Sequence, residues 1–347
     1  GASVSTTFDV TVTNTNDAPT VDQGIADQSV DEDNGLSFAM PADAFDDVDV
    51  GDSQTLAASG MPAWMSFDGT TFTGTPDNDD VGVVTITVTA TDGAGASVST
   101  TFDVIVDNTN DAPVARADNF ITTEDTASIS GNVFGDNGNG VDVDIDGDIF
   151  SIYEVNGDVA NVGQTVPGSA GGLFSIRSDG TFSFQPNGDF ESLAVGETAT
   201  STATYAIDDG NGGFDTATVT VTINGVNDDP TARDDAFSTT DDTVSITGSV
   251  FDDNGQGADS DVDVNDTFTV VAVNGTGAGV GQPIAGDNGG LITVNTDGTF
   301  EFFTNGDFDD LNLGATRVTT ITYTIEDGFG GTSTASVAVT VTGTNSA

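Results

Sequence analysis

The sequence has no cysteine, no histidine and no lysine, and its only basic residues are four arginines. Without thiols and imidazoles the chain cannot form disulfides, zinc–thiolate sites, haem ligation, or a Ser-His-Asp or Cys-His catalytic group. Acidic residues number 57, so the formal net charge is −53. Nucleic acids and anionic membranes need clustered positive charge in a partner. The composition therefore excludes them and favours cations, although an acidic surface suited to a salty medium accounts for part of the charge.

Long apolar runs are also missing. No stretch is long enough to span a bilayer, and residue 1 does not open a signal peptide, so we expect no direct membrane insertion. The lack of cysteine leaves the compartment open, because large bacterial surface proteins can do without disulfides. A length of 347 residues favours two or three domains. We expect the sequence to be a segment of something longer.

Internal repeats divide the chain. "GASVSTTFDV" occurs at Gly1 and again at Gly95, and "NTNDAP" follows both times. Residues 1–16 therefore match the last strand of a preceding repeat, and residues 17–110 form one complete repeat. Such repetition indicates a function distributed along an array.

A second repeat type follows the first. "RADNFITTEDT" at Arg116 matches "RDDAFSTTDDT" at Arg233, and "SDGTFSFQPNGDF" at Ser178 matches "TDGTFEFFTNGDF" at Thr296. The two copies occupy residues 111–227 and 228–347.

The local pattern predicts an all-β fold. Stretches such as "VVTITVTAT" (83–91) alternate apolar residues with threonine, and Gly- and Asp-rich turns separate them. About seven such strands per repeat suit a Greek-key sandwich. Trp64, Phe67 and Phe72 are expected to fill the first core.

The segment "GMPAWMSFDGTTFTGTPDNDDVGVVTITVTATDG" (60–93) resembles the dystroglycan-type cadherin-like (CADG) and putative-Ig repeats of bacterial surface proteins. The later copies resemble VCBS repeats, through an Asp-rich loop, "DGTF", "NGDF" and "DGNGG". The resemblance implies tandem Ig/cadherin-like β-sandwich domains, arranged as an elongated rod, in an RTX-type adhesin. It also implies a place outside the cell or on the bacterial surface.

The stretch "GVDVDIDGD" (140–148) has an aspartate at every second position. In an extended strand these carboxylates would share one direction and repel one another. Calcium resolves the conflict, because it binds six to eight oxygens with flexible geometry. The cadherin resemblance places this stretch in a B–C loop, beside the F–G loop and the incoming linker.

Three junctions follow from that placement, each binding Ca²⁺ between neighbouring repeats. The first would use Asn16, Asp17, Asp47, Asp49, Asp52 and Asp92. The second would use Glu32, Asp33, Asp77, Asp79, Asp80, Asn110, Asp111, Asp142, Asp144, Asp146, Asp148 and Asp209. The third would use Glu124, Asp125, Asp189, Glu191, Asn227, Asp228, Asp259, Asp261, Asp263, Asp266 and Asp327. The linker "NTNDAP" is one residue shorter than the usual cadherin linker, so the number of ions stays open.

Other readings of the acidic loop are weaker. "DVDIDG" (142–147) matches the first half of an EF-hand, but Tyr153 stands where the last ligand should be and no helices flank it. A β-roll would need tandem nonapeptides. A solvated acidic turn without metal remains the alternative.

The resulting prediction is a non-enzymatic, calcium-stiffened extender or adhesion module for cell attachment and biofilm formation. Its partners would be calcium, neighbouring repeats, and other copies of itself or surface glycans. Three alternatives stay open: carbohydrate binding by the first repeat, self-processing at the labile Asp229–Pro230 bond, and filament assembly by strand donation from residues 1–13. Paired carboxylates could also serve a glycosidase, but none is singled out.

Overall fold

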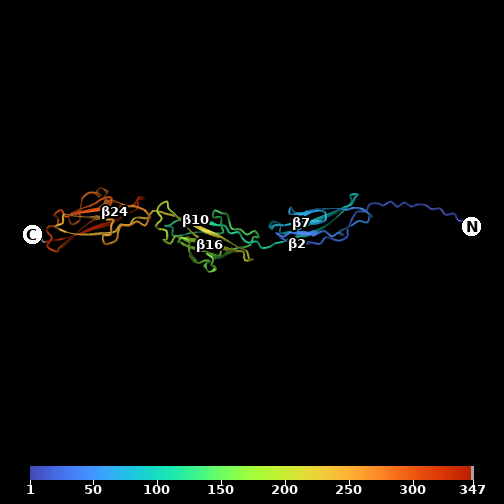
Figure 1. The fold of residues 1–347 in the computed structure, drawn as a ribbon, viewed down its shortest axis with the longest axis horizontal. Coiled ribbons are helices and arrows are strands. Elements are labelled where there is room, and N and C mark those ends of the chain that lie inside the picture. The colour runs from blue at the N-terminus through green and yellow to red at the C-terminus, as the bar shows by residue number, and fades with distance from the viewer. Residues whose placement is uncertain (345–347) are drawn as a thin grey trace. The chain divides into compact units, whose positions relative to one another are not determined.

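The computed structural model describes residues 1–344, and its regular structure is β apart from three short 3₁₀ helices (Figure 1). These are η1 (Asn78–Asp80), η2 (Val159–Asn161) and η3 (Gly277–Gly279). The chain divides into two compact units. Unit 1 holds residues 1–113 with the loops 143–150 and 208–214, and unit 2 holds the rest. Among the described residues no helix has the length and apolar character needed to cross a membrane.

The first group of sheets lies in unit 1. One sheet has the order β2-β9-β8-β5, a second has β3-β7-β6, and a short third pairs β1 with β4. The strands are β1 (Thr20–Val21), β2 (Gln28–Asp31), β3 (Leu36–Ala39), β4 (Phe45–Asp46), β5 (Thr55–Ser59), β6 (Met65–Phe67), β7 (Thr71–Gly74), β8 (Gly82–Thr91) and β9 (Ser97–Asp107).

The second group belongs to the first of the two similar repeats. Its sheets have the orders β10-β17-β16-β12 and β11-β15-β14-β13. The strands are β10 (Asp118–Thr123), β11 (Ile129–Asn132), β12 (Ser151–Val155), β13 (Thr165–Pro167), β14 (Leu173–Ile176), β15 (Thr181–Gln185), β16 (Thr198–Asp208) and β17 (Phe214–Asn224).

The third group repeats that plan, as β18-β25-β24-β20 and β19-β23-β22-β21. The strands are β18 (Asp235–Thr240), β19 (Ser245–Ser249), β20 (Thr269–Val273), β21 (Ile284–Ala285), β22 (Leu291–Val294), β23 (Thr299–Phe303), β24 (Thr316–Glu326) and β25 (Thr332–Thr342). In every group an early strand pairs in parallel with the last one: β2 with β9, β10 with β17 and β18 with β25. The predicted all-β class with tandem sandwiches is confirmed.

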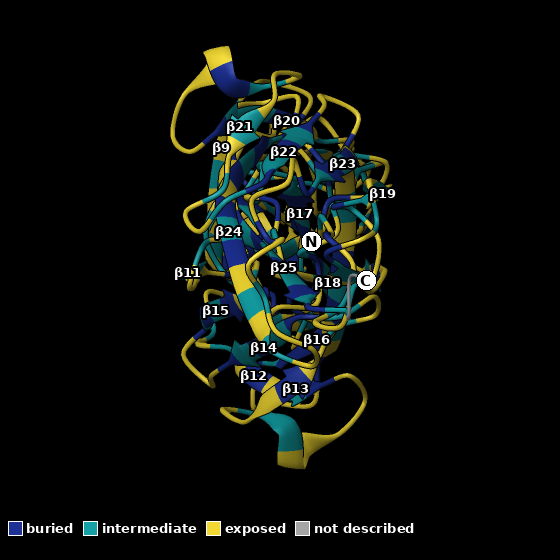
Figure 2. Cartoon of the chain, turned by 90° about the vertical axis from the view of Figure 1, so that its left-hand side faces the viewer, coloured by how far each residue is buried: buried dark blue, intermediate teal, exposed yellow. Residues whose placement is uncertain are grey.

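Each sandwich encloses an apolar core that follows from the alternation in the sequence. In β25 the side chains of Val337, Val339 and Val341 are fully buried, while the residues between them are partly exposed. Figure 2 shows exposed residues concentrated in the loops that join the strands. In the first core Phe72 is fully buried and stacks on Phe67 at 4.2 Å, and Trp64 packs against the same cluster. The three predicted core aromatics therefore do meet there.

Residues 1–19 contain no strand, although their start is identical to the beginning of the segment that forms β9. Val4, Phe8, Val10 and Val12 are exposed. The expectation that this segment is the last strand of a preceding repeat stays a prediction, because among the described residues it has no partner strand. The difference is pairing: eight of the same ten residues, 97–104, are extended in β9 because β8 pairs along them, and β2 pairs with the end of that strand.

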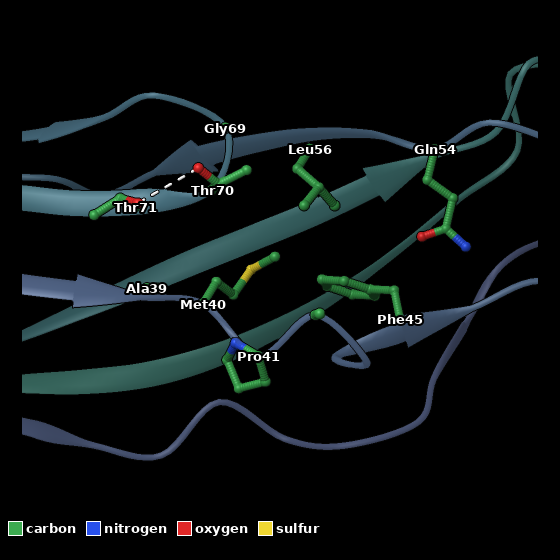
Figure 3. Close-up of a pocket in the computed structure, with 10 residues that line it drawn as sticks. Ala39, Met40, Pro41, Phe45, Gln54, Leu56, Gly69, Thr70 and Thr71 are labelled. Atoms are coloured by element: carbon green, nitrogen blue, oxygen red, sulfur yellow. Dashed lines mark hydrogen bonds between the residues drawn. The ribbon is translucent and has the colours of Figure 1, made fainter.

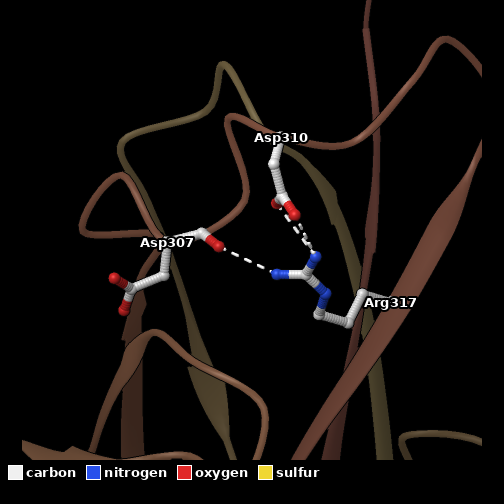
Figure 4. A network of polar contacts seen from close by, with 3 residues as sticks. All are labelled: Asp307, Asp310 and Arg317. Carbon is white, nitrogen blue, oxygen red and sulfur yellow. Dashed lines mark hydrogen bonds and ion pairs between the residues drawn. The ribbon is translucent and has the colours of Figure 1, made fainter.

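One ion pair stands out among the described residues (Figure 4). Arg317 on β24 donates to both carboxylate oxygens of Asp310, at 2.9 and 2.7 Å, and to the backbone oxygen of Asp307 at 2.9 Å. Its guanidinium carbon lies 5.5 Å from the ring centroid of Phe308. The arginine thus fastens the turn after β23 to the sheet, with a small net stabilisation because the pair is exposed.

Core truncation should be costly in this arrangement. Phe302 is fully buried among the residues of the third core. Phe302→Ala should lower the free energy of unfolding of that sandwich by about 3–5 kcal/mol, since it removes a ring from a packed site. Hydrogen exchange of peptides covering β22 to β24 measures the effect. The control Val318→Ala, on the exposed side of β24, should change it by less than about 0.5 kcal/mol. Equal effects of the two substitutions would contradict the core assignment.

Candidate metal centres

The acidic loop of the second repeat is irregular rather than extended. Residues 142–148 form no strand. Gly147 donates its backbone N–H to the backbone oxygen of Asp144 at 3.2 Å, which closes a turn. The Asp144 carboxylate accepts the backbone N–H groups of Asp146 and Asp148. The turn brings the carboxylates of these three residues within 4.8 Å of one another. The fourth, on Asp142, is directed elsewhere, so a shared direction for all four is wrong.

The same hydrogen bonds occur in all three repeats. In each loop the first aspartate accepts the backbone N–H of the second through Oδ1, at 2.9 to 3.0 Å. The second aspartate accepts the backbone N–H of a linker aspartate through Oδ2, at 2.6 to 2.9 Å. The trios are Asp47, Asp49 and Asp17; Asp144, Asp146 and Asp111; and Asp261, Asp263 and Asp228. The loops thus hold the linkers by their backbone.

One oxygen is left over at the same place in each loop. The Oδ2 atoms of Asp47, Asp144 and Asp261 are buried and have no hydrogen-bond partner. So are the Oε2 atoms of Glu32 and Glu124. A buried carboxylate oxygen without a partner is destabilising, since it has lost water and gained nothing. Three such atoms recur at one position of the loops and two recur on the glutamates, and a cation that binds oxygen would satisfy them.

The two glutamates tie the end of each sandwich to the outgoing linker. Glu32 Oε1 accepts the backbone N–H of Thr109 at 2.6 Å, and Glu124 Oε1 accepts that of Val226 at 2.5 Å. In the third repeat Asp241 takes the same part, accepting from Thr344 N at 2.8 Å. Glu32 and Glu124 therefore each fix a linker through Oε1 while Oε2 has no partner. In the third repeat Thr344 Oγ1 donates to the same Asp241 Oδ1 that accepts the Thr344 N–H.

A third recurring aspartate shapes the loop between the last two strands. Asp92, Asp209 and Asp327 each accept two or three backbone N–H groups through Oδ1. Each also accepts the side-chain amide of a linker asparagine at 2.9 Å: Asn16, Asn110 and Asn227 respectively. These bonds hold the pKa of all three carboxyls below the usual range, with the asparagine as the main cause for Asp92 and Asp209.

The acidic groups gather into three candidate centres. We name them centre I, II and III by the carboxylates whose oxygens lie within 4.8 Å of one another. Centre I has Asp47, Asp52 and Asp92, centre II has Glu32, Asp111 and Asp146, and centre III has Asp125, Glu191 and Asp228. Neighbouring loop and linker groups are counted with each centre: Asp49 with centre I; Asn110, Asp144 and Asp148 with centre II; and Glu124, Asn227, Asp261, Asp263 and Asp266 with centre III. Centres I and II lie in unit 1 and centre III lies in unit 2.

Repulsion within the centres is visible in the linker aspartates. Burial raises the pKa of Asp111, and the neighbouring charges of Asp146 and Glu32 raise it further. Burial followed by the charge of Asp125 raises the pKa of Asp228 to about 6. A divalent cation among these oxygens would replace repulsion with attraction.

Several predicted ligands lie apart from the centres. Asp189 accepts the backbone N–H of Gly172 and so braces a turn. Asp77 is the N-cap of η1, and Asp79 and Asp80 lie within that helix, where Asp80 accepts the Asp77 N–H. Asp33 is exposed, with φ of 58°, although its charge contributes to the raised pKa of Asp111. None of these belongs to a cluster of three carboxylates among the described residues.

Asp142 and Asp259 point into their own sandwiches. Asp142 accepts the backbone N–H of Arg116 at 2.7 Å and the hydroxyl of Tyr205 at 3.4 Å. Asp259 does the same with Arg233 and Tyr323, at 2.7 and 3.0 Å. In this structure both anchor the acidic loop to its sandwich, and their part as ligands stays a prediction.

Each tyrosine is surrounded by more acceptors than its single proton can serve. Tyr205 is fully buried, and Asp118 Oδ2, Asp142 Oδ2 and two backbone oxygens lie within 3.4 Å of its hydroxyl. In the sister repeat Asp235 Oδ2 is buried without a partner. Burial raises the pKa of Asp118 and of Asp235 to about 6.

Sequence reasoning missed the tyrosines and two asparagines. Asn78 donates its side-chain amide to Asp146 Oδ1 at 2.8 Å, and Asn211 donates to Asp148 Oδ2 at 2.5 Å. A signal was present for both, because they stand inside "PDNDD" and "DDGNGG". For the tyrosines the only signal was their recurrence in β16 and β24.

A separate depression of about 340 Å³ lies in the first sandwich (Figure 3). Met40, Pro41, Phe45 and Leu56 supply its apolar wall, and Gln54, Thr70 and Thr71 are the polar side chains at it. No carboxylate lines it. It therefore takes no part in the candidate metal centres.

Comparisons with known proteins place these features in a family. The bacterial cadherin-like domain family matches residues 110–225 and 227–343, and the family described as "Putative Ig domain" matches residues 18–107. No curated protein matches the chain. Cadherin-like domains generally bind calcium, which the acidic clusters here fit.

Solved structures agree on the fold. Protocadherin Gamma B2 extracellular domains 1–5 match with a TM-score of 0.55 at 17% identity, over 95% of this chain. The chain spans only 60% of that structure. Mouse Cadherin-23 domains EC22–24 match with a TM-score of 0.50 at 16% identity, over 95% of this chain and 99% of the other.

The buried tyrosine clusters predict a pH dependence. Since the pKa of Asp235 is about 6 in the folded chain and 3.8 as the ordinary value, the folded state binds the proton more tightly. The contribution of Asp235 to the free energy of unfolding of the third sandwich should therefore be fully present below pH 4. It should be lost as the pH rises through 6. Asp235→Asn removes the charge and supplies a donor at every pH, as the protonated carboxyl does only at low pH. It should therefore stabilise the sandwich by about 1–3 kcal/mol at pH 7 and flatten the dependence of the melting temperature on pH. Thermal melts in chelator between pH 4.5 and 8 measure this.

The exposed Asp252→Asn serves as the control and should leave the slope unchanged. The assignment would be refuted if the melting temperature of Asp235→Asn changed between pH 5 and pH 7 by the same amount as that of the wild type and of the control.

Proposed function

The chain belongs to the bacterial cadherin-like domain family, and on that premise we propose that it is a calcium-binding extender and adhesion module of a bacterial cell-surface or secreted protein. Family and fold together support an extracellular, adhesion-type module. In the proposal the working unit is the linker between sandwiches, and the module carries out no chemical reaction. Its partners are calcium, the neighbouring repeats and further copies of such modules.

A single observation carries the proposal. Asp47, Asp144 and Asp261, which stand at the same place in the three acidic loops, each leave one buried oxygen without a partner. Solvation cannot satisfy these atoms, and the chain has too few cations to do so, since its only basic residues are four arginines. Calcium accepts six to eight oxygens of the carboxylate, amide and carbonyl types present here.

Centre II illustrates which groups would hold the ion. Glu32 belongs to the first sandwich, Asp111 to the linker, and Asp144 and Asp146 to the loop after β11. Bound calcium would supply a positive charge shared by all of these carboxylates. Glu32 and Asp146 already fix the linker through its backbone, so the residues themselves set its path and the ion removes their repulsion.

Centres I and III would work in the same way. In centre I the ligands would be Asp47, Asp52, Asp92 and Asp49. Asp92 accepts from linker residue Asn16, and Asp49 accepts from linker residue Asp17. In centre III they would be Glu124, Asp125, Glu191, Asp228, Asp261, Asp263 and Asp266. Each set joins a linker to the loops beside it. Binding restricted to the folded arrangement stabilises that arrangement by mass action.

Weak affinity suits this role. Extracellular calcium modules bind with dissociation constants of about 10⁻⁴ to 10⁻³ M, which matches calcium levels outside cells. We propose that the linkers are held at such concentrations and are released by chelation. Attachment between cells or to surfaces would then depend on external calcium, as would any part in biofilm formation.

Calcium should raise the melting temperature of the chain, and removal of one ligand should weaken that gain. Asp144→Asn removes the charge of the oxygen left unpartnered in centre II but keeps the bond to the Asp146 N–H. We expect a weaker calcium response of the linker peptide 107–113, with both neighbouring cores still folded. Calorimetry and hydrogen exchange, with calcium and with chelator, measure the two effects.

Asp179→Asn, in the turn between β14 and β15, is the matched control and should bind calcium as the wild type does. Identical melting curves of the wild type in calcium and in chelator would sink the proposal. Unfolding of the second sandwich by Asp144→Asn at saturating calcium would show that this loop is structural instead.

A further inference from the structure

Centres II and III share one plan but differ in the groups that face their aspartates. We propose that centre III binds calcium more tightly than centre II and fills first as calcium rises. This inference rests on the proposed function and adds an order of loading to it. It stands on three replacements between the centres, each visible in the hydrogen bonds.

The first replacement concerns the second aspartate of the loop. In centre II both oxygens of Asp146 are occupied, by the Asn78 amide at 2.8 Å and the Asp111 N–H at 2.6 Å. In centre III the Asp228 N–H occupies Asp263 Oδ2 at 2.9 Å, and Oδ1 has no partner. Asp263 is only 3% exposed, so water does not replace the missing amide.

The second replacement concerns the last aspartate of the loop. Asn211 donates its side-chain amide to Asp148 Oδ2 at 2.5 Å. The corresponding position in the sister loop is Phe329, which has no side-chain donor, and Asp266 Oδ2 is buried without a partner. An ion entering centre II must therefore displace an amide that centre III lacks.

The third replacement adds charge. The connection between β7 and β8 supplies the neutral Asn78 to centre II. The connection between β15 and β16 supplies Glu191, whose carboxylate lies within 4.8 Å of those of Asp125 and Asp228. An additional carboxylate at that range strengthens attraction for a divalent cation.

The unpartnered oxygens show the combined result. In the described part of the chain, centre II has two buried oxygens without a hydrogen bond, Glu32 Oε2 and Asp144 Oδ2. Centre III has six: Glu124 Oε2, Asn227 Oδ1, Asp228 Oδ2, Asp261 Oδ2, Asp263 Oδ1 and Asp266 Oδ2. Each of these atoms can bind an ion without giving up an existing bond, so the free energy released on binding is larger at centre III.

An order of loading has a physical consequence for the linkers. At intermediate calcium the linker around Asn227 and Asp228 would be fixed while that around Asn110 and Asp111 would still be mobile. The chain would then stiffen in two steps rather than one.

Hydrogen exchange at peptide level separates the two centres in the intact chain. Calcium is titrated from chelator to 10 mM while protection is followed in peptides 107–113 and 224–231. We expect the midpoint for 224–231 to lie at least about threefold lower in calcium, and isothermal titration should resolve two classes of site.

Two exposed substitutions exchange the distinguishing groups. Phe329→Asn introduces an amide beside Asp266 and should raise the midpoint of centre III by about 3- to 10-fold. Asn211→Phe removes the amide from Asp148 and should lower the midpoint of centre II. Leu313→Asn, a surface change between β23 and β24, is the control and should move neither.

The outcomes distinguish this inference from the function on which it rests. Equal midpoints, or a lower midpoint for 107–113, would overturn the order of loading and leave calcium binding intact. Failure of both exchange substitutions to move their midpoints would overturn the assigned cause. No calcium dependence in either peptide would overturn the proposed function itself.

Discussion

The hydrogen bond from a linker N–H to a loop carboxylate is the interaction on which the rest of this structure depends. It recurs at Asp49, Asp146 and Asp263, and it fixes where each linker lies beside an acidic loop. The same bond brings like charges together, because the linker residue that donates is itself an aspartate. Order at the linkers and repulsion at the linkers therefore have one cause. A cation bound among these oxygens would relieve the repulsion without disturbing the hydrogen bond.

The core and the acidic loops are joined through a few buried polar groups. Asp142 and Asp259 begin their loops inside the sandwich, held by a backbone N–H and a tyrosine hydroxyl. A second carboxylate, Asp118 or Asp235, acts on the same tyrosine hydroxyl. Core packing thus decides where the exposed part of the loop starts, and the loop decides where its remaining carboxylates gather.

Much of the fold could be predicted from the sequence, because period-two alternation, Gly/Asp turns and internal repeats are local signals. Val337, Val339 and Val341 are buried as that alternation requires. The acidic loop was harder, since periodicity assumes an extended chain and cannot foresee the turn at Gly147. Residue spacing alone placed Asp142 with Asp144, whereas the structure separates them by the direction of their side chains. Asn78 and Asn211 escaped notice because an amide that donates to a carboxylate looks, in sequence, like any turn residue.

The parallel pairing at each sandwich edge has a mechanical consequence. In each of the three sandwiches an early strand and the last strand are hydrogen-bonded neighbours that run in the same direction. Force applied through the two linkers pulls such a pair in opposite senses along its length. The six-residue ladder between β10 and β17 is then loaded in shear, so its bonds must fail together rather than unzip one at a time. A chain built from such units can carry tension between two anchored ends without any of its sandwiches being thick or its core large.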